Sequence, residues 1–598
     1  MSTKAIRVTG GVFTMPYPRS DLLRALLATL ACLAIAFPAF AVSRIDIHVG
    51  GISYSGAEVE NVAAKLDMDG GWQGKATLKQ SDLAQLAKQQ SLPVAVSKGN
   101  AQGQVSFSGV AGNLLQFRLE AALRDIAFSD AEGRRAGEAL DGRISLAAQR
   151  SGERWHWQGL LDWTAGELYW QPLYFANGGH VLNADGWLSA DTLAVEQGEL
   201  SLAEIGRVAF NGRLSLADKT LASLQLSAND LHAGNAYTLL LRPFLQKGTF
   251  GDLAMSGQVD FQADISNQRV KNFEVSLRDL DVEDSRRRFA LYKLNAHIPW
   301  GYDDKTRAWV RYDGGQLLGL RLGAARHQVT LERYSLTAPH LDLPLLDGVL
   351  VMNDVAAALV NDRWHWRVRA DMQPVSMAEL SQALGWPRME GKVAMHIPMM
   401  YYTGGQLSAD GDLRFEVFDG TVAVKGLAMQ EPLGLAPRLS ADLEMRNLDL
   451  GLLTSTFSFG AIQGKLDGDV KGLALSSWQP VKFDASFRSS PGDYPKKISQ
   501  RAVENISALG GAGAAVAIQR SFLRFFKEFN YASIGLSCKL DNGVCAMDGI
   551  APAQSGYVIV KGSGIPAITV LGYNRSVNWG ELLERVQRIT HGNKPVIK

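Results

Sequence analysis

Cysteine is scarce in this sequence, with three residues in 598, at positions 32, 538 and 545. The chain has no Cys-x-x-Cys motif, and no second Cys/His cluster accompanies the pair at 538 and 545. A zinc half-site or a dithiol redox site therefore has no support.

Long apolar runs and an excess of charge of one sign are also missing. After residue 41 no segment approaches 18 uninterrupted apolar residues, which excludes a multi-span transporter. The chain has 61 basic and 60 acidic residues without a long run of either sign. It therefore lacks the basic footprint of a nucleic-acid-binding protein.

Catalytic signatures are absent as well. The ten histidines are scattered, none belongs to an HExxH motif, and the sequence has no GxSxG elbow and no Walker-type loop. His156 and His365 each lie between two tryptophans, but in a strand the two rings share one face and the imidazole points to the other. We therefore expect a protein that is not an enzyme and that uses no metal and no cofactor.

One apolar segment is present near the N-terminus. Two arginines precede the apolar residues 25–41, which end in a small-residue Ala-Phe-Ala pattern. The segment is shorter than the roughly 20 residues of a membrane span and predicts a signal peptide, with a mature chain from residue 42. Two alternatives stay open: an uncleaved inner-membrane anchor, and a lipoprotein processed at Cys32. Met15 is an alternative start.

Cys538 and Cys545 flank an Asp-Asn-Gly sequence. Asn-Gly between short alternating segments is typical of a tight β-hairpin turn, which places the two cysteines on neighbouring strands. In an oxidising compartment we expect them to form a cross-strand disulfide.

Alternation of apolar and polar residues dominates the chain after residue 42. In residues 258–265, for example, Val, Phe, Ala and Ile alternate with Gln and Asp. Asp-Gly and Asn-Gly turns recur from end to end. These patterns predict a mostly β fold, a long antiparallel meander of strands with one wet and one dry face.

Helical patterns are few and short. In three places an apolar turn or short helix precedes a Gly-punctuated strand, which indicates a repetitive β-rich body. The candidate helices are residues 81–90, 236–246, 376–384, 496–509, 518–529 and 579–589.

The helix predicted over residues 518–529 carries phenylalanines at helical spacing, flanked by arginines and a lysine. It either caps the end of a sheet or rests on a membrane surface. Its candidate membrane or cap residues are Phe522, Phe525, Phe526 and Phe529.

Strands with one polar and one apolar face form a sheet whose apolar face must be covered. The few predicted helices are not enough to cover it. The sheet can pack on itself as sandwiches, close into barrels, or curl into a trough with an apolar interior. In an extracytoplasmic compartment a trough would hold lipid acyl chains, because each buried methylene contributes about 0.8 kcal/mol. The candidate lipid-groove residues are Val259, Phe261, Leu413, Phe415, Leu443, Val481 and Phe483.

The C-terminal part of the chain carries a family resemblance. SIGLSCKLDNGVCAMDGI (residues 533–550) and residues 555–589 resemble the end of YdbH-type proteins of the AsmA-like superfamily, which includes TamB. The Gly-rich strands of residues 462–489 are similar in style, and residues 43–449 share that style alone. Domains of this type have carried the label "dicarboxylate transport", but with at most one span this chain cannot be a permease.

The resemblance implies a periplasmic, bridge-like protein of a Gram-negative cell envelope. Its fold would be an elongated, curled β-groove (a β-taco) that conducts phospholipids between the inner and outer membranes, with residues 25–41 as a possible inner-membrane anchor. Its implied partner is a small outer-membrane lipoprotein, bound by strand addition at the C-terminal end. The expected division is a signal or anchor (1–41), an N-terminal groove segment (42–235), a central groove (236–485) and a C-terminal cap (486–598).

Two other functions fit the same sequence. One is a scaffold for outer-membrane protein assembly, which would capture client strands at an exposed sheet edge. The other is a secreted carbohydrate-binding protein that uses Trp155, Trp157, Trp364 and Trp366 as sugar platforms.

Overall fold

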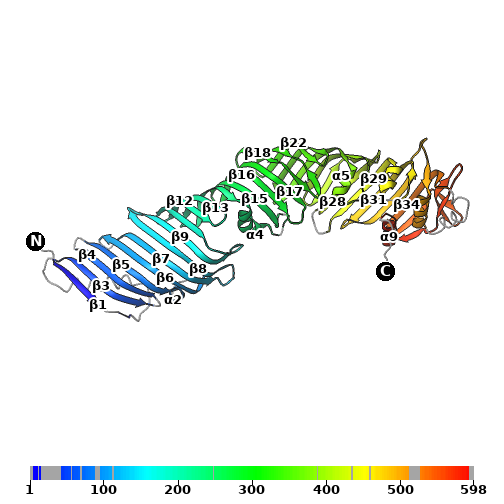
Figure 1. The fold of residues 1–598 in the computed structure, drawn as a ribbon. Helices are drawn as coiled ribbons and strands as arrows, with labels where there is room; N and C mark the ends of the chain where they lie inside the picture. Colours follow the sequence, from blue (N-terminus) through cyan, green and yellow to red (C-terminus); the bar gives the residue numbers. More distant parts are fainter. Residues whose placement is uncertain are drawn as a thin grey trace. The chain divides into compact units, whose positions relative to one another are not determined.

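Strands dominate the structure, a computed structural model in which 71% of residues lie in strands and 9% in helices (Figure 1). The predicted fold class, a mostly β antiparallel meander with a few short helices, is confirmed. The described residues are 4–10, 13–14, 42–54, 57–67, 70–87, 94–110, 113–246, 248, 250–386, 388–432, 436–456, 459–510 and 526–590.

The predicted signal segment, residues 25–41, lies outside the described residues. Among the helices that the structure describes, none has the length and apolar character needed to cross a membrane.

The chain divides into two compact units. Unit 1 comprises Met1–Ser285 and His297–Tyr302, and unit 2 comprises Arg286–Ala296 and Asp303–Lys598. The predicted boundaries after residues 235 and 485 do not coincide with this division. The first falls inside unit 1, and the second falls within a strand of unit 2.

Unit 1 is a meander in which each long strand pairs with the next in antiparallel orientation. Two N-terminal strands, β1 (Lys4–Gly10) and β2 (Phe13–Thr14), pair with β3 in parallel instead. The other strands are β3 (Val42–Tyr54), β4 (Ala57–Asp67), β5 (Gly71–Asp82), β6 (Ala95–Val110), β7 (Asn113–Ser129), β8 (Arg135–Ser151), β9 (Arg154–Trp170), β10 (Leu173–Phe175), β11 (His180–Leu188), β12 (Thr192–Leu202), β13 (Gly206–Ser215), β14 (Thr220–His232), β15 (Leu253–Ser266) and β16 (Arg269–Asp284).

Unit 2 continues the same style of pairing, and β17 (Phe289–Gly301) contributes residues to both units. Its other strands are β18 (Lys305–Tyr312), β19 (Gly314–Leu317), β20 (Leu320–Leu322), β21 (Ala325–Glu332), β22 (Ser335–Leu345), β23 (Gly348–Val360), β24 (Arg363–Ser376), β25 (Lys392–Thr403), β26 (Gln406–Asp410), β27 (Leu413–Val417), β28 (Gly420–Gln430), β29 (Arg438–Asp449), β30 (Ile462–Gln463), β31 (Lys465–Ser476), β32 (Gln479–Ser489), β33 (Lys497–Ser499), β34 (Glu528–Asp541), β35 (Val544–Gly549), β36 (Ala551–Ala553), β37 (Gly556–Gly562), β38 (Val570–Gly572) and β39 (Ser576–Asn578).

Five of the six predicted helices are confirmed. The sixth prediction, residues 518–529, is wrong at its end, because Phe529 belongs to strand β34 and is 1% exposed. Phe526 precedes that strand, while Phe522 and Phe525 lie outside the described residues. The observed helices are α2 (Leu83–Ala87), α3 (Ala233–Ala236), the π-helix η1 (Tyr237–Leu241), α4 (Arg242–Leu245), α5 (Met377–Ala383), α6 (Leu450–Thr456), α7 (Gln500–Gly510) and α9 (Trp579–Thr590).

Bulges interrupt several of the long strands in a recurring way. At three of them an Asp or Asn has a positive φ of 53° to 57°, and its N–H donates to an Asp carboxylate of the neighbouring strand. A bulge bends its strand, and here the carboxylate satisfies the backbone donor that the bulge leaves unpaired. The donor–acceptor pairs are Asp125–Asp141 (2.7 Å), Asp230–Asp260 (2.8 Å) and Asn447–Asp467 (2.8 Å).

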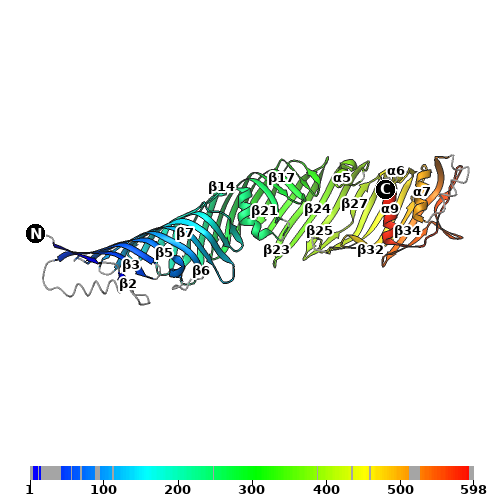
Figure 2. The ribbon, with the colours of Figure 1, turned by 60° about the horizontal axis from the view of Figure 1, so that its bottom comes forward.

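A sealed hydrophobic core lies at the C-terminal end of unit 2. It includes Leu450 and Ile462, which precede the predicted cap of residues 486–598, and from here on we use the name C-terminal cap for residues 450–590. Figure 2 shows α7 and α9 beside β34 in this cap. Tyr531 and Phe529 are 1% exposed and Tyr557 is fully buried. The core also includes Leu450, Ile462, Ile498, Val503, Ile559, Val560, Val570, Val577 and Leu582.

The cysteine hairpin of the cap is confirmed. Asn542 and Gly543 have φ angles of 48° and 75°, the positive values that a two-residue hairpin turn requires between β34 and β35. Cys538 and Cys545 form a disulfide with a Cα–Cα distance of 5.5 Å. Cys545 is opposite Leu540 rather than Cys538, so the bridge runs diagonally across the two strands.

The disulfide is expected to stabilise the cap. The double variant Cys538→Ala/Cys545→Ala should unfold with about 2 kcal/mol less stability in this region, since the bridge closes a short loop in the unfolded chain. Urea unfolding followed by tryptophan fluorescence measures the difference. Dithiothreitol should lower the stability of the wild type and leave the stability of the double variant unchanged. Equal stability of all four samples, each protein with and without dithiothreitol, would contradict this role.

His180 makes the stability of unit 1 pH-dependent. Its ring lies 4.9 Å from the Trp163 ring and 5.3 Å from Phe175, and its Nδ1 accepts a hydrogen bond from the Ala203 N–H at 3.1 Å. Burial lowers the pKa of His180 below its ordinary value of 6.5. The imidazole therefore binds a proton at a lower pH in the folded protein than in the unfolded chain.

The free energy of unfolding of unit 1 should not depend on His180 titration above about pH 6.5, and it should fall as the pH drops below that value. NMR titration should report a pKa under 6.5 for His180. The variant His180→Gln should lose part of the acid sensitivity in urea unfolding, whereas His156→Gln, at an exposed position, should keep it. An unshifted His180 pKa would refute the assignment.

Candidate functional site

The strand register places the apolar side chains of unit 1 in continuous rows that run across the strands. Partners in the ladder stack side by side on one face, so a row is read from one directly opposite residue to the next. The first row is Gly74, Phe107, Phe117, Ala148, Trp157, Gly186, Val195, Gly212, Leu224 and Ile265.

Two further rows lie beside the first on the same face, two residues along each strand. At about 4.8 Å per strand, the row from Ala76 to Phe273 is roughly 50 Å long. The second row is Ala76, Val105, Leu119, Leu146, Gly159, Ala184, Gly198, Phe210, Leu226, Ala263 and Phe273, and the third is Val59, Leu78, Gly103, Ala121, Ile144, Leu161, Leu182, Leu200, Val208, Ala228, Phe261 and Val275.

Unit 2 has rows of the same kind. One is Leu343, Leu350, Met372, Met395, Phe415, Val422, Met445, Gly468, Phe487 and Leu536. A second is Leu413, Val424, Leu443, Val470, Ala485 and Cys538. A third is Leu331, Leu336, Ala357, Trp366, Tyr402, Leu407, Met429, Leu439 and Leu475. We call the face that carries these rows the apolar face of each unit.

The apolar face of unit 1 is not sealed like the core of the cap. Among the described side chains from residue 59 to residue 201, the buried hydrophobic residues are alanines: Ala76, Ala101, Ala121, Ala127 and Ala194. The Phe, Leu, Val and Trp side chains of the rows are only half-buried in that stretch, and Leu161 is 39% exposed. A sandwich core would bury these large side chains before its alanines.

Aromatic rings of the rows lie flat over glycines of the neighbouring strand. A Cβ added at Gly198 would lie 2.4 Å from Phe210 Cε2, and one added at Gly74 would lie 2.3 Å from Phe107. The directly opposite pairs Gly109–Trp72, Gly137–Phe128, Gly468–Phe487 and Gly572–Tyr557 repeat this arrangement. Rings that lie along the sheet cover backbone without rising far from it.

Two indole groups on the apolar face are polar exceptions. The Nε1 atoms of Trp72 and Trp157 are buried and have no hydrogen-bond partner among the described residues. Trp155 and Trp157 share this face and His156 is exposed on the other, as predicted from alternation. In β24, Trp364 and Trp366 are 56% and 36% exposed, and Trp366 stacks on Tyr402 with ring centroids 5.4 Å apart.

The structure separates the predicted groove residues into three groups. Phe261, Phe415 and Leu443 are half-buried members of the apolar rows. Leu413 is a row member that is 9% exposed, and Val481 is 46% exposed on β32.

Val259 and Phe483 are covered by local structure. Val259 packs against the cluster of Leu202, Ile205 and Leu231, which the η1 residues Leu239 and Leu240 also contact. Phe483 makes an edge contact with Trp579 of α9, with ring centroids 5.3 Å apart. Neither side chain therefore belongs to the open part of the apolar face.

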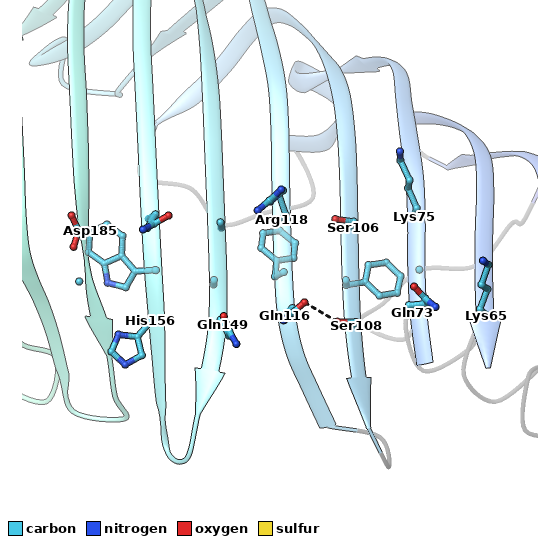
Figure 3. A pocket seen from close by; sticks show the side chains of 18 of the residues that line it. Lys65, Gln73, Lys75, Ser106, Ser108, Gln116, Arg118, Gln149, His156 and Asp185 are labelled. Carbon is cyan, nitrogen blue, oxygen red and sulfur yellow. Dashed lines mark hydrogen bonds between the residues drawn. The ribbon is translucent and has the colours of Figure 1, made fainter. Parts of the chain in front are cut away.

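The opposite face of the same strands is polar. Figure 3 shows part of it in unit 1, where Gln73, Lys75, Gln116, Arg118 and Gln149 extend from neighbouring strands. In the described part of the chain, no three His, Cys, Asp or Glu side chains are grouped so that they could hold a metal ion. The arrangement of the apolar face suits apolar contact along a broad surface.

Neither the protein-family models nor the curated proteins that were searched match this chain.

The glycines under the aromatic rings should not tolerate a methyl group. Gly198→Ala should cost about 1–3 kcal/mol by overpacking against Phe210. Gly159→Ala is the matched control in the same row, because its Cβ would meet no atom closer than 3.8 Å. Thermal unfolding should show a lower Tm for Gly198→Ala alone, with partial recovery in Gly198→Ala/Phe210→Leu; equal Tm values for the two alanine variants would contradict the packing argument.

Proposed function

We propose that this protein holds and conducts lipid acyl chains along its apolar face, as a non-enzymatic lipid conduit of the cell envelope. The observation that supports the proposal best is the unsealed state of the apolar rows. Large apolar side chains remain half-exposed on strand after strand of unit 1, whereas the cap of unit 2 shows that this chain can seal a core.

The energetics favour an apolar chain as the occupant. Each methylene moved from water onto the rows contributes about 0.8 kcal/mol, and the rows offer many equivalent positions along one direction. An acyl chain can therefore shift from one strand to the next with little change in contact energy. A headgroup would stay at the rim, because the described row members offer it few polar partners.

The setting of this activity is also a proposal. The resemblance of residues 450–590 to YdbH-type proteins of the AsmA-like superfamily leads us to propose phospholipid as the cargo and the Gram-negative periplasm as the compartment. A disulfide in the cap fits an oxidising compartment. Transfer between inner and outer membrane, with a small outer-membrane lipoprotein at the C-terminal end, belongs to the same proposal.

Lipid retention tests the proposal directly. The chain from residue 42 should co-purify with phospholipid detectable by mass spectrometry of an organic extract. Leu226→Asp places a charge in the second row, and Ser227→Asp places it one residue away on the polar face. Retained lipid should fall several-fold in Leu226→Asp and stay at the wild-type level in Ser227→Asp, with both variants folded by circular dichroism.

Other outcomes separate the alternatives. Lipid-free wild-type protein that captures unfolded outer-membrane barrel precursors would replace the conduit with an assembly scaffold. Lipid-free protein that binds glycans, and loses them in Trp364→Ala/Trp366→Ala, would favour the carbohydrate reading, since these two rings are exposed.

A further inference from the structure

A depression of about 780 Å³ opens on the polar face of unit 1. It is lined by triplets of consecutive residues from neighbouring strands, such as Ser106 to Ser108 and Gln116 to Arg118. The middle residue of each triplet belongs to the first apolar row, so the outer two side chains point to the opposite face. Neighbours on the apolar face, such as Val105 and Leu119, are not among the lining residues, which places the depression on the polar side.

Small side chains create this depression. Ser106, Ser108 and Ala147 lie between longer residues of the flanking strands, and the Ser108 hydroxyl hydrogen-bonds to Gln116 Oε1 at 3.3 Å. Donor groups therefore surround an open space. The floor is the backbone of the sheet.

Cations gather at one side of this depression without carboxylate partners. Lys65, Lys75 and Arg118 line it, and no ion pair joins any of them to a carboxylate among the described residues. Two cations of these and adjacent strands are paired: Lys79 of β5 lies 2.8 Å from Glu60, and Arg44 of β3 lies 2.8 Å from Asp67 of β4. The carboxylates that line the depression, Asp185 and Glu196, come from β11 and β12.

The register brings two of these cations to one spot. Lys75 is directly opposite Ser106 on one side, and Arg118 is directly opposite Ser106 on the other. Figure 3 shows the three side chains in line across three neighbouring strands. Directly opposite residues have Cβ atoms about 5 Å apart, so the two long cationic side chains start about 10 Å apart and can converge over the short serine.

We propose that Lys75, Ser106 and Arg118 form a binding site for the phosphate of a phosphate ester. The Arg118 guanidinium would take two phosphate oxygens, the Lys75 ammonium a third, and the Ser106 hydroxyl would donate from the floor. The site lies on the face opposite the apolar rows. This proposal therefore does not depend on whether those rows hold acyl chains. A phospholipid headgroup and a soluble phosphate ester share this chemistry, and the experiment separates them.

Binding is measured on the chain from residue 42 at low ionic strength with two probes. Glycerol 3-phosphate is titrated by calorimetry, and vesicles of phosphatidylglycerol or phosphatidylcholine are tested by co-flotation. The test variant is Lys75→Ala/Arg118→Ala. The control is Lys79→Ala, which removes a lysine of the same strand that is already paired.

Saturable binding of glycerol 3-phosphate that weakens at least tenfold in Lys75→Ala/Arg118→Ala, and less than twofold in Lys79→Ala, supports a site for a soluble ester. Flotation only with phosphatidylglycerol, lost in the same double variant alone, supports a headgroup site. The proposal is overturned if the wild type binds neither probe, or if Lys79→Ala weakens binding as much as the double variant. Circular dichroism and Tm confirm that all variants fold.

Discussion

Strict alternation of apolar and polar residues, held in register from strand to strand, is the constraint on which this structure depends. Alternation gives each strand one apolar side, and the register lines those sides up into rows such as Ala76 to Phe273. A register shift of one residue would move every apolar side chain of a strand to the polar face. The bulges interrupt the ladder without destroying the rows, and at three of them a carboxylate of the neighbouring strand accepts a hydrogen bond from the backbone N–H that the bulge leaves unpaired.

Helices seal parts of the apolar residues, whereas the strands of unit 1 between residues 59 and 201 leave their large apolar side chains half-buried. The η1 residues Leu239 and Leu240 cover the ends of a few strands in unit 1, and α7 and α9 complete the core of the cap. Glycines also determine the form of the apolar rows. The rings of Phe107 and Phe210 lie over Gly74 and Gly198, so these bulky residues add apolar area without projecting far from the sheet.

Much of the fold could be predicted from local chemistry, and much of the site could not. A two-residue hairpin turn needs two positive φ angles, which Asn542 and Gly543 readily adopt, so the sequence predicts this hairpin. Short segments with helical apolar periodicity likewise predict helices such as α5 and α9. Val259 and Phe483 lie in strands with the same alternating pattern as Phe261. In the structure, η1 residues pack on the cluster that includes Val259, and Trp579 contacts Phe483. Such contacts between separate segments cannot be predicted from the alternation within one strand.

The bulges and the polar-face depression could not be predicted from the sequence either. In the sequence, Asp467, which accepts a hydrogen bond from the Asn447 N–H, cannot be distinguished from a solvated residue of the polar face. Lys75, Ser106 and Arg118 are 43 positions apart at most, yet only the observed register brings them together. One-sided strands predict that a row exists, but not which residues share it.

Nearest-neighbour pairing has a consequence for how such a chain is built. Because each long strand of unit 1 bonds almost entirely to its immediate predecessor and successor, the architecture is close to one-dimensional, like that of a repeat protein. Assembly can proceed strand by strand from one end, and loop-closure costs stay small because contacting segments are close in sequence. Length then becomes an adjustable property: inserting or deleting a hairpin would lengthen or shorten the device while leaving the cap and its disulfide untouched.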